Sequence, residues 1–240
     1  MSVEELSKQR QDPVAGIKSI YFQDVILSIG EGTAHSFSIQ PVFPIRIAEN
    51  LKIISYTIIP IQYVPPLAPG LGSSFGLGNI LINGYFSSIQ KKGKFSWGVG
   101  PSIQLPTRTN ESLGSNRVSI GPSALVYYAG DKFSGGAVVQ NYWSLGGTGI
   151  NKVNLFSCQY IAYYNLPEGW FLESNTTAQA NWLADQGQEW FIPVGGGGGK
   201  TFKIGDGKLF YCATAQFFYN AVKPDIVGDW EAVLQFQIIF

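Results

Sequence analysis

The sequence predicts an all-β fold, a single antiparallel transmembrane β-barrel of about twelve strands. Three observations lead to this prediction. The segment 230–240 alternates between apolar and polar side chains, strand-like runs follow one another through most of the chain, and the junctions between runs are alternately short and long. A transmembrane barrel needs such strands, with one face toward lipid and the other toward the lumen.

The segment 230–240 is the clearest of these strands. It ends in Phe240, and an aromatic C-terminal residue is a feature that outer-membrane barrels share. We expect this strand to close the barrel against the first strand, near residues 18–29. Its apolar face carries Trp230, Ala232, Leu234, Phe236, Ile238 and Phe240, and its polar face carries Glu231, Gln235 and Gln237.

The composition agrees with a chain that is short of charged surface. Only 13% of the 240 residues are charged, against roughly a quarter in a typical soluble domain, and the formal net charge is zero. This balance gives no argument for a nucleic-acid partner. No apolar run approaches the roughly 18 residues of a membrane-spanning helix, so any span must be a closed barrel.

The chain divides into an N-terminal arm, residues 1–16, and a barrel, residues 17–240. The arm is polar, could form one short helix, and lies on the periplasmic side in this interpretation. It has neither the apolar core nor the cleavage site of an export signal. Since a barrel of this kind must be exported, we expect that the signal has been removed.

The candidate strands are each roughly 11 to 15 residues long, enough to cross a bilayer at a tilt. They are 18–29, 33–47, 51–63, 76–89, 94–106, 117–129, 132–144, 151–165, 169–182, 188–203, 208–222 and 229–240. Every second junction is tight and rich in Gly, Asp or Asn, which supply the backbone angles of short hairpins. These junctions are 48–50, 90–94, 130–132, 167–169 and 205–207.

Two parts of the sequence fit a barrel strand poorly. Pro193 lies inside the candidate strand 188–203, where a closed barrel offers no edge to shelter it. The glycine run 195–199 follows in the same strand and could allow sharp coiling or close packing of an element in the lumen.

Tryptophans near both ends of the candidate strands are expected in the aromatic girdles at the two membrane interfaces. Trp170 and Trp182 lie on one face of a strand and would be about 40 Å apart if it were fully extended. The candidate girdle residues are Trp170, Trp182, Trp230 and Phe240.

The polar faces of the strands predict the wall of the lumen. The candidate lining residues are Arg46, Lys52, Tyr56, Glu173, Asn175, Gln179, Asn181, Gln216, Glu231, Gln235 and Gln237. The charged members could form a constriction that selects solutes, or ion pairs that fill a narrow lumen, and the sequence favours neither. Side chains or the N-terminal arm could close a barrel of this size.

The sequence offers little support for an enzyme. The one histidine, His35, is followed by Ser36, but adjacent strand residues point to opposite faces and cannot form a dyad. Cys158 and Cys212 are predicted on opposite faces, which argues against a disulfide. No catalytic residue, metal site or cofactor is predicted.

Several short motifs, taken in order, resemble an outer-membrane family named for the phenol meta-cleavage pathway, whose members are often labelled transporter or neuromedin U. The motifs are 98–107, Ile120-Gly-Pro122, 163–170, Ala180-Asn-Trp182, 192–196 and Tyr219-Asn220. The resemblance extends from about Asp12 to Phe240 and implies a Gram-negative outer-membrane barrel linked to uptake of aromatic or other small compounds. The family supplies no established site residues. Tyr56 stands where a basic residue is expected, which implies a less cationic lumen.

Three functions remain open from the sequence. The first is an outer-membrane channel for passive passage of small solutes, with aromatic or hydrophobic ones as candidates. The second is a non-transporting envelope barrel with a plugged lumen, and the third is a soluble sandwich or lipocalin-like binder. The expected partners of the barrel are the lipid bilayer and lipopolysaccharide, the barrel-assembly machinery and small solutes, with no nucleic acid.

Overall fold

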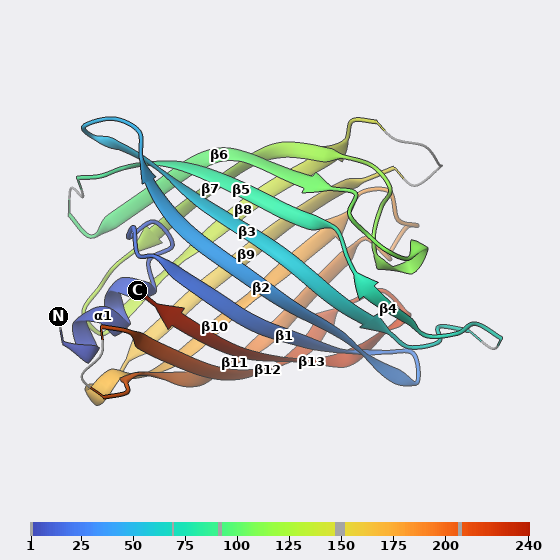
Figure 1. The fold of residues 1–240 in the computed structure, drawn as a ribbon. Coiled ribbons are helices and arrows are strands. Elements are labelled where there is room, and N and C mark those ends of the chain that lie inside the picture. The colour runs from blue at the N-terminus through green and yellow to red at the C-terminus, as the bar shows by residue number, and fades with distance from the viewer. Residues whose placement is uncertain (1, 69, 91–92, 147–151, 206–207) are drawn as a thin grey trace.

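The described residues form a closed antiparallel β-barrel whose strands are strongly tilted (Figure 1). The computed structural model describes residues 2–68, 70–90, 93–146, 152–205 and 208–240. Strand β1 pairs with both β2 and β13, and a pairing between β2 and β3 completes the ring. No helix in these ranges is long and apolar enough to cross a membrane.

The elements follow the predicted order. The helices are α1 (Val3–Arg10), η1 (Glu111–Leu113) and η2 (Pro167–Gly169). The strands are β1 (Ser19–Ile29), β2 (Gly32–Arg46), β3 (Leu51–Val64), β4 (Ser74–Leu77), β5 (Ile80–Ser88), β6 (Phe95–Leu105), β7 (Ser119–Tyr128), β8 (Phe133–Ser144), β9 (Asn154–Asn165), β10 (Trp170–Asn181), β11 (Trp190–Lys203), β12 (Phe210–Val222) and β13 (Val227–Ile239).

The predicted barrel of about twelve strands is confirmed, although the candidate strand 76–89 begins as two pieces. Strand β4 pairs with Ile61–Val64 of β3, and β5 pairs with the earlier part of β3, so the two share one place in the ring. The chain between them lies close to β3, where Gly78 N donates to Pro60 O at 2.9 Å. A Cβ on Gly78 would lie 2.3 Å from Gln62 Oε1, so a side chain here would displace the end of Gln62.

The outer face of the barrel is apolar, as a membrane-spanning wall requires, and the inner face carries buried polar side chains beside smaller apolar clusters. Strand β12 shows the pattern clearly, because Thr214, Gln216 and Asn220 are buried while Phe217 and Tyr219 are each 59% exposed. The closing strand β13 follows the same rule and pairs with β1 from Ser19↔Ile239 onward. The predicted pairing of the last strand with the first is therefore confirmed.

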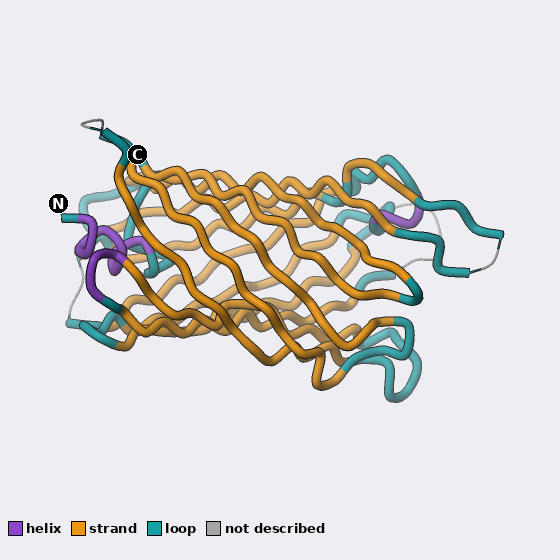
Figure 2. The backbone as a smooth tube through the Cα atoms, turned by 90° about the horizontal axis from the view of Figure 1, so that it is seen from below, coloured by secondary structure: helices purple, strands orange, loops and turns teal. Residues whose placement is uncertain are grey.

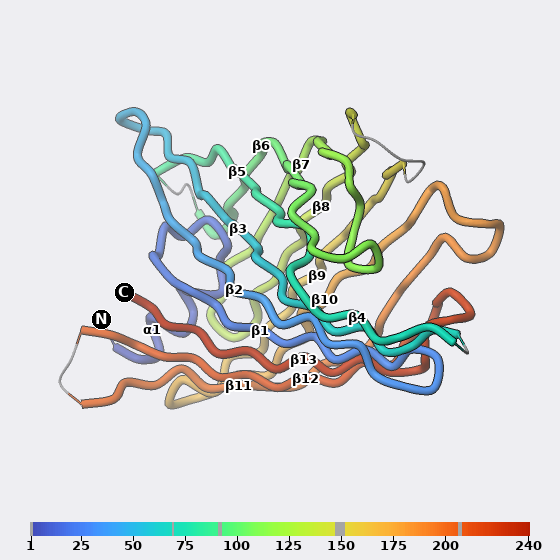
Figure 3. The backbone as a smooth tube through the Cα atoms, turned by 45° about the vertical axis from the view of Figure 1, so that its right-hand side comes forward, coloured from blue at the N-terminus to red at the C-terminus, as the bar shows by residue number. Residues whose placement is uncertain are grey.

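The predicted tight turns lie at one end of the barrel, and the long connections lie at the other end together with the two-residue turn between β1 and β2. Both termini and α1 lie at the end with the tight turns (Figure 2), and the longer connections extend from the other end (Figure 3). The turn 167–169 contains Glu168 at φ 58°, and Glu168 N donates to Glu4 Oε1 at 2.9 Å. The predicted junctions 90–94 and 205–207 lie partly outside the described residues.

Helix α1 starts at a capping box that the sequence encodes directly. The Ser2 hydroxyl accepts a hydrogen bond from Glu5 N at 3.1 Å, and Glu5 Oε2 accepts one from Ser2 N at 2.9 Å. The bond from the Ser2 backbone holds the pKa of Glu5 below its ordinary value. After the helix, Asp12 Oδ1 accepts from Val14 N and turns the chain toward β1.

The ladder between β10 and β11 is interrupted at the glycine run. Pairs run from Trp170↔Lys200 to Glu173↔Gly197 and resume only at Gln179↔Phe191. Polar side chains occupy part of this interval, since Ser174 Oγ donates to Gly195 O and Tyr160 Oη donates to Pro193 O, both at 2.6 Å. Pro193 lies at a register shift of β11 against β12, which explains how a proline fits this strand.

The five glycines bring strand backbones close together. A Cβ on Gly195 would lie 2.2 Å from Phe217 O, and one on Gly197 would lie 2.0 Å from Ala215 O. On the other side, a Cβ on Gly196 would lie 2.6 Å from Glu173 O. The run therefore serves mainly the packing of β11 against its neighbours in the wall.

Candidate functional site

Residues 2–16, called the plug below, lie at the tight-turn end of the lumen. Helix α1 buries Leu6, Ser7 and Arg10, which are at most 5% exposed, whereas Lys8 and Gln9 face solvent. Its contacts within the barrel are mainly with β11 and η2. One face of the helix therefore packs against the barrel interior, and the other face is exposed to solvent.

Side chains make the polar contacts between the plug and the barrel wall. Gln11 is held on both sides, since its Nε2 donates to Asn165 Oδ1 and its Oε1 accepts from Ser134 Oγ, both at 2.8 Å. Asp12 Oδ2 accepts from Ser96 Oγ at 2.6 Å. Within the described ranges, no backbone hydrogen bond links residues 2–16 to a strand. The plug is thus docked in the barrel without being part of its ladder.

The end of the plug also packs into an apolar cluster inside the barrel. Val14 is 1% exposed and contacts buried side chains of β2, β3, β5 and β7. These side chains are Val42, Ile54, Tyr85 and Leu125. Burial of one valine side chain contributes roughly 1.5–3 kcal/mol relative to exposure, so Val14 is a substantial anchor.

Arg10 is the buried cation of the plug. Its Cζ lies 4.3 Å from the centroid of the Phe171 ring and 5.8 Å from that of Tyr163. Its Nε donates to Thr201 Oγ1 at 3.0 Å, and Thr201 in turn donates to Ser7 Oγ at 3.1 Å. The guanidinium is therefore placed by two aromatic rings and one hydroxyl.

Two buried charged groups at this contact keep an unsatisfied atom. Arg10 Nη2 and Glu173 Oε1 are each buried without a hydrogen-bond partner. Glu173 follows Phe171 by two residues on the inward face of β10 and is 5% exposed. Among the described carboxylates, none forms an ion pair with Arg10.

A cavity of about 360 Å³ fills the lumen on the other side of the plug. We call it the chamber, and the plug residues Arg10, Gln11 and Pro13 form its floor. Strands β2 to β8 contribute mainly apolar and aromatic side chains, among them Val42, Ile54, Tyr56, Tyr85, Leu125 and Val138. Strands β9, β10, β13 and β1 contribute most of the polar ones, among them Gln159, Asn175, Thr177, Gln179, Glu231, Gln235 and Gln23.

Hydrogen bonds fix the polar side chains of the chamber. Tyr56 Oη donates to Gln40 Oε1, and Gln40 Nε2 donates to Gln23 Oε1 at 2.9 Å. Glu231 Oε1 accepts from Thr176 Oγ1 at 2.7 Å. Because these groups bond to one another, the wall presents orientated donors and acceptors to anything that enters the chamber.

The structure distributes the predicted lumen residues over two levels. Tyr56, Asn175, Gln179, Glu231 and Gln235 line the chamber. Lys52, Glu173, Gln216 and Gln237 are buried without lining it. The four predicted charges therefore do not form one ring, because Glu231 lies in the chamber wall while Lys52 and Glu173 are buried outside it.

Two predicted lining residues stand at strand ends and do not line the chamber. Arg46 is exposed and donates to the turn carbonyls of Ala48 and Glu49, at 3.2 and 3.1 Å. Asn181 is exposed, and its Oδ1 accepts from Leu183 N at 3.1 Å. Strand alternation assigned both to the lumen, but neither contacts the chamber, because the adjoining turn binds each side chain.

The candidate girdle residues lie on the outside of the barrel. Trp170 and Trp182 stand at opposite ends of β10 and are 49% and 46% exposed. Trp182 packs edge-on against Trp190, with ring centroids 5.5 Å apart. Trp230 stacks on Phe217 at 6.0 Å, and Phe240 is 58% exposed.

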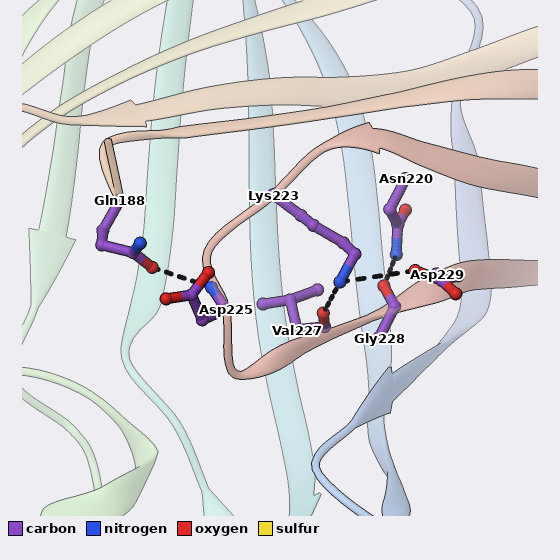
Figure 4. A network of polar contacts seen from close by, with 7 residues as sticks. All are labelled: Gln188, Asn220, Lys223, Asp225, Val227, Gly228 and Asp229. Atoms are coloured by element: carbon purple, nitrogen blue, oxygen red, sulfur yellow. Dashed lines mark hydrogen bonds and ion pairs between the residues drawn. The ribbon is translucent and has the colours of Figure 1, made fainter.

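At the end opposite the plug, polar contacts link two long connections (Figure 4). Asp225 N donates to Gln188 Oε1 at 2.7 Å, which joins the connection after β10 to the one after β12. Lys223 Nζ lies 3.4 Å from Asp229 Oδ1 and also donates to Val227 O. These contacts fix the connections beside the interrupted part of the wall.

The remaining reactive side chains are distributed over both faces of the wall. His35 Nδ1 lies 3.1 Å from Asp24 Oδ2, on the outer face, because Ser36 lines the chamber. Cys158 and Cys212 are free thiols, and Cys212 is fully buried. The described chain contains no cluster of three or more His, Cys, Asp or Glu that could hold a metal ion.

The plug residues Arg10 and Gln11 and the tyrosines Tyr21 and Tyr85 were not predicted as part of the site. The polar arm has no periodic pattern that indicates which surface it contacts, so its position in the lumen could not be predicted from the sequence. Tyr21 and Tyr85 lie in candidate strands, and counting alternate positions from the predicted neighbours would have found them.

Comparison with known proteins places this architecture in context. A family model described as "Putative MetA-pathway of phenol degradation" matches residues 34–207, more than half of the chain. The crystal structure of an outer membrane channel from Pseudomonas putida F1 is similar, with 13% identity, coverage of 93% of this chain and 94% of that one, and a TM-score of 0.67. The NanC porin is similar at 9% identity, with coverage of 93% and 98% and a TM-score of 0.55. A search of curated proteins found no significant match.

Proposed function

The chain belongs to the family described by that phenol-degradation model, and from this premise we propose that it is an outer-membrane channel for passive passage of small aromatic or hydrophobic solutes. The chamber inside the lumen is the observation that carries the proposal. The barrel resembles outer-membrane channels in fold, which supports a location in the outer membrane of a Gram-negative envelope.

The chemistry of the chamber suits a small molecule with an apolar ring and a polar edge. Its apolar side offers Tyr85, Leu125 and Val138, and its polar side offers amide groups. Aromatic side chains favour offset or edge-on contact with another ring. A cavity of about 360 Å³ is at the lower end of ordinary ligand pockets, so the proposed solutes are small.

A paired substitution tests whether solutes pass through the chamber. Val138 lines it, whereas Val139 lies on the opposite face of β8 and is 38% exposed. We expect Val138→Trp to slow the flux of small phenols into proteoliposomes several-fold, because the indole fills the chamber. Val139→Trp adds the same side chain outside the barrel and should leave the flux unchanged.

The alternative function, a non-transporting envelope barrel, is supported by the seated plug. Since the plug forms the floor of the chamber, flux requires that the plug leave its site. If the wild-type protein passes no solute in liposomes, and variants with a loosened plug pass none either, the channel proposal fails. Equal flux through both valine variants would also contradict passage through the chamber.

A further inference from the structure

The contact between Arg10 and the barrel wall differs from the other contacts of the plug. Gln11 bonds on both sides to neutral groups of the wall, and both carboxylate oxygens of Asp12 accept a hydrogen bond. Arg10 is also buried, but its Nη2 has no hydrogen-bond partner. Leaving a buried polar atom unsatisfied costs about 1–3 kcal/mol, and more when the group is charged.

Glu173, in the wall, also has a buried atom without a hydrogen-bond partner. Glu173 is buried with Oε1 unsatisfied, and it interacts electrostatically with Arg10 without forming an ion pair. Arg10 carries a positive charge, Glu173 is the carboxyl group that interacts with it, and each keeps one atom without a hydrogen bond. These unbonded atoms offset part of what the two rings and Thr201 contribute, so the seat holds Arg10 while its release into water stays accessible.

Nothing in the backbone resists such a withdrawal within the described residues. The plug has no ladder bond to any strand, and Gly16, at φ +85°, joins it to the segment before β1. Since all its polar links to the wall use side chains, the plug can leave as a unit while the barrel remains closed.

From these contacts we infer that Arg10 is the latch of an autoinhibitory plug, held closed by the Phe171 and Tyr163 rings, the Thr201 hydroxyl and the carboxyl group of Glu173. Seating the guanidinium closes the channel, and its release opens it. The inference rests on the proposed function, because a plug regulates only a pore that conducts. It goes further in assigning the closed state to one side chain and the groups that hold it.

Cys212 provides a direct report of plug release. It pairs across the ladder with Thr201, whose hydroxyl accepts from Arg10, and it packs in the same buried cluster as Phe171 and Tyr163. Its thiol is fully buried while the plug is seated. The chain has two cysteines, so Cys158→Ser leaves Cys212 as the only thiol that a reagent can modify.

The experiment measures the rate at which a small charged methanethiosulfonate modifies Cys212 in the full-length Cys158→Ser protein, beside its open fraction in planar bilayers. Arg10→Met keeps an unbranched apolar stem and removes the guanidinium with its charge and hydrogen bond. We expect it to raise both quantities about tenfold or more, because a charged hydrogen bond contributes roughly 1.5–3 kcal/mol. Glu173→Gln should raise both in the same direction.

Lys8→Met is the matched control, since it removes the same charge from the exposed face of the same helix. It should leave both quantities at their wild-type values. Arg10→Lys keeps the charge but loses the planar fork, so it should give an intermediate result. It also provides a second test if Arg10→Met does not reach the heat-modifiable, folded form.

The possible outcomes separate this inference from the channel proposal. If Arg10→Met and Lys8→Met behave alike in thiol modification, the latch is overturned whatever the currents show. If Arg10→Met exposes Cys212 but no variant conducts, the latch stands and the channel function fails. Faster modification together with more frequent opening supports both.

Discussion

Single residues decide how closely the strands of this barrel approach one another. The glycine run 195–199 appeared in the sequence as an anomaly within a strand, with coiling or packing as alternatives. In the structure, a side chain at Gly195 or Gly197 would collide with a carbonyl of β12. The sequence signals that some backbone approaches closely here, but it cannot say which backbone, because that depends on the register of β11.

Gly197→Ala tests this close approach. Its Cβ would lie 2.0 Å from Ala215 O, so the ladder must shift to admit it. We expect a loss of about 1–3 kcal/mol in stability, the usual range for overpacking. The measurement is the temperature at which the folded band disappears on a gel.

Gly72→Ala is the control for that substitution, because a Cβ on Gly72 would meet nothing within 4 Å. It should leave the unfolding temperature unchanged. If Gly197→Ala unfolds at the same temperature as the wild type, the strands beside β11 can shift to admit the methyl group at little cost, and the prediction is wrong.

Alternation along the strands accounts for the side chains that line the chamber at positions within the strands. Tyr56, Asn175 and Gln235 line the chamber because a period of two fixes the face of each. Arg46 and Asn181 have the same alternation but do not line the chamber. At a strand end the next turn supplies partners, and a side chain bonds to them in place of the lumen.

At the scale of the element, α1 shows how a local signal and a tertiary contact combine. Its capping box can be read from Ser2 and Glu5 alone. Its burial cannot, because an eight-residue helix is marginal by itself and depends on packing. The sequence therefore allowed a short helix in the arm without indicating that Leu6 and Arg10 would face the barrel.

Ser2→Ala should loosen the plug without touching the wall. The substitution removes the acceptor of Glu5 N and weakens the start of α1 by about 1 kcal/mol. We expect a modest increase in modification of Cys212, smaller than that of Arg10→Met. Gln9→Ala, on the exposed face of the same helix, is the control and should not change the rate.

Strand elements were predicted closely, and the exception has a physical cause. The candidate strand 76–89 is divided because the chain at Gly78 bonds to Pro60 O before β5 begins. In the sequence, Gly78 was included in the candidate strand 76–89. Only the position of β3 reveals that it marks a break.

At the scale of the whole molecule, a closed barrel followed from strand number, strand length and alternating junctions. These features are periodic, so they survive small errors at individual boundaries. The position of the plug did not follow, because it depends on contacts of Gln11 and Asp12 with Asn165, Ser134 and Ser96, far away in the sequence.

The outer wall should respond to charge as a lipid-facing surface does. Val99 lies near the middle of β6 and is 48% exposed on the outside of the barrel. Because a charge near the bilayer midplane is costly, we expect Val99→Arg to lower the free energy of unfolding of the vesicle-bound protein by about 2–4 kcal/mol. Urea titration of the vesicle-bound protein measures this change.

Ile204→Arg is the comparison for that substitution, since Ile204 follows β11 at the tight-turn end and is 65% exposed. There the cost should be close to zero, because charge is tolerated near the interface. Equal costs at the two positions would contradict a bilayer around the barrel.

The seam between β1 and β13 has a consequence for the order of assembly. It joins the two ends of the chain, with Ser19 opposite Ile239 and Phe240 N donating to Lys18 O at 3.0 Å. Contacts so distant in sequence carry the largest loop-closure entropy, so this ladder is the slowest to nucleate. Only residues 17 and 18 separate the plug from the seam. The plug therefore reaches the lumen while the cylinder is still an open sheet, or is drawn in as its last two edges meet.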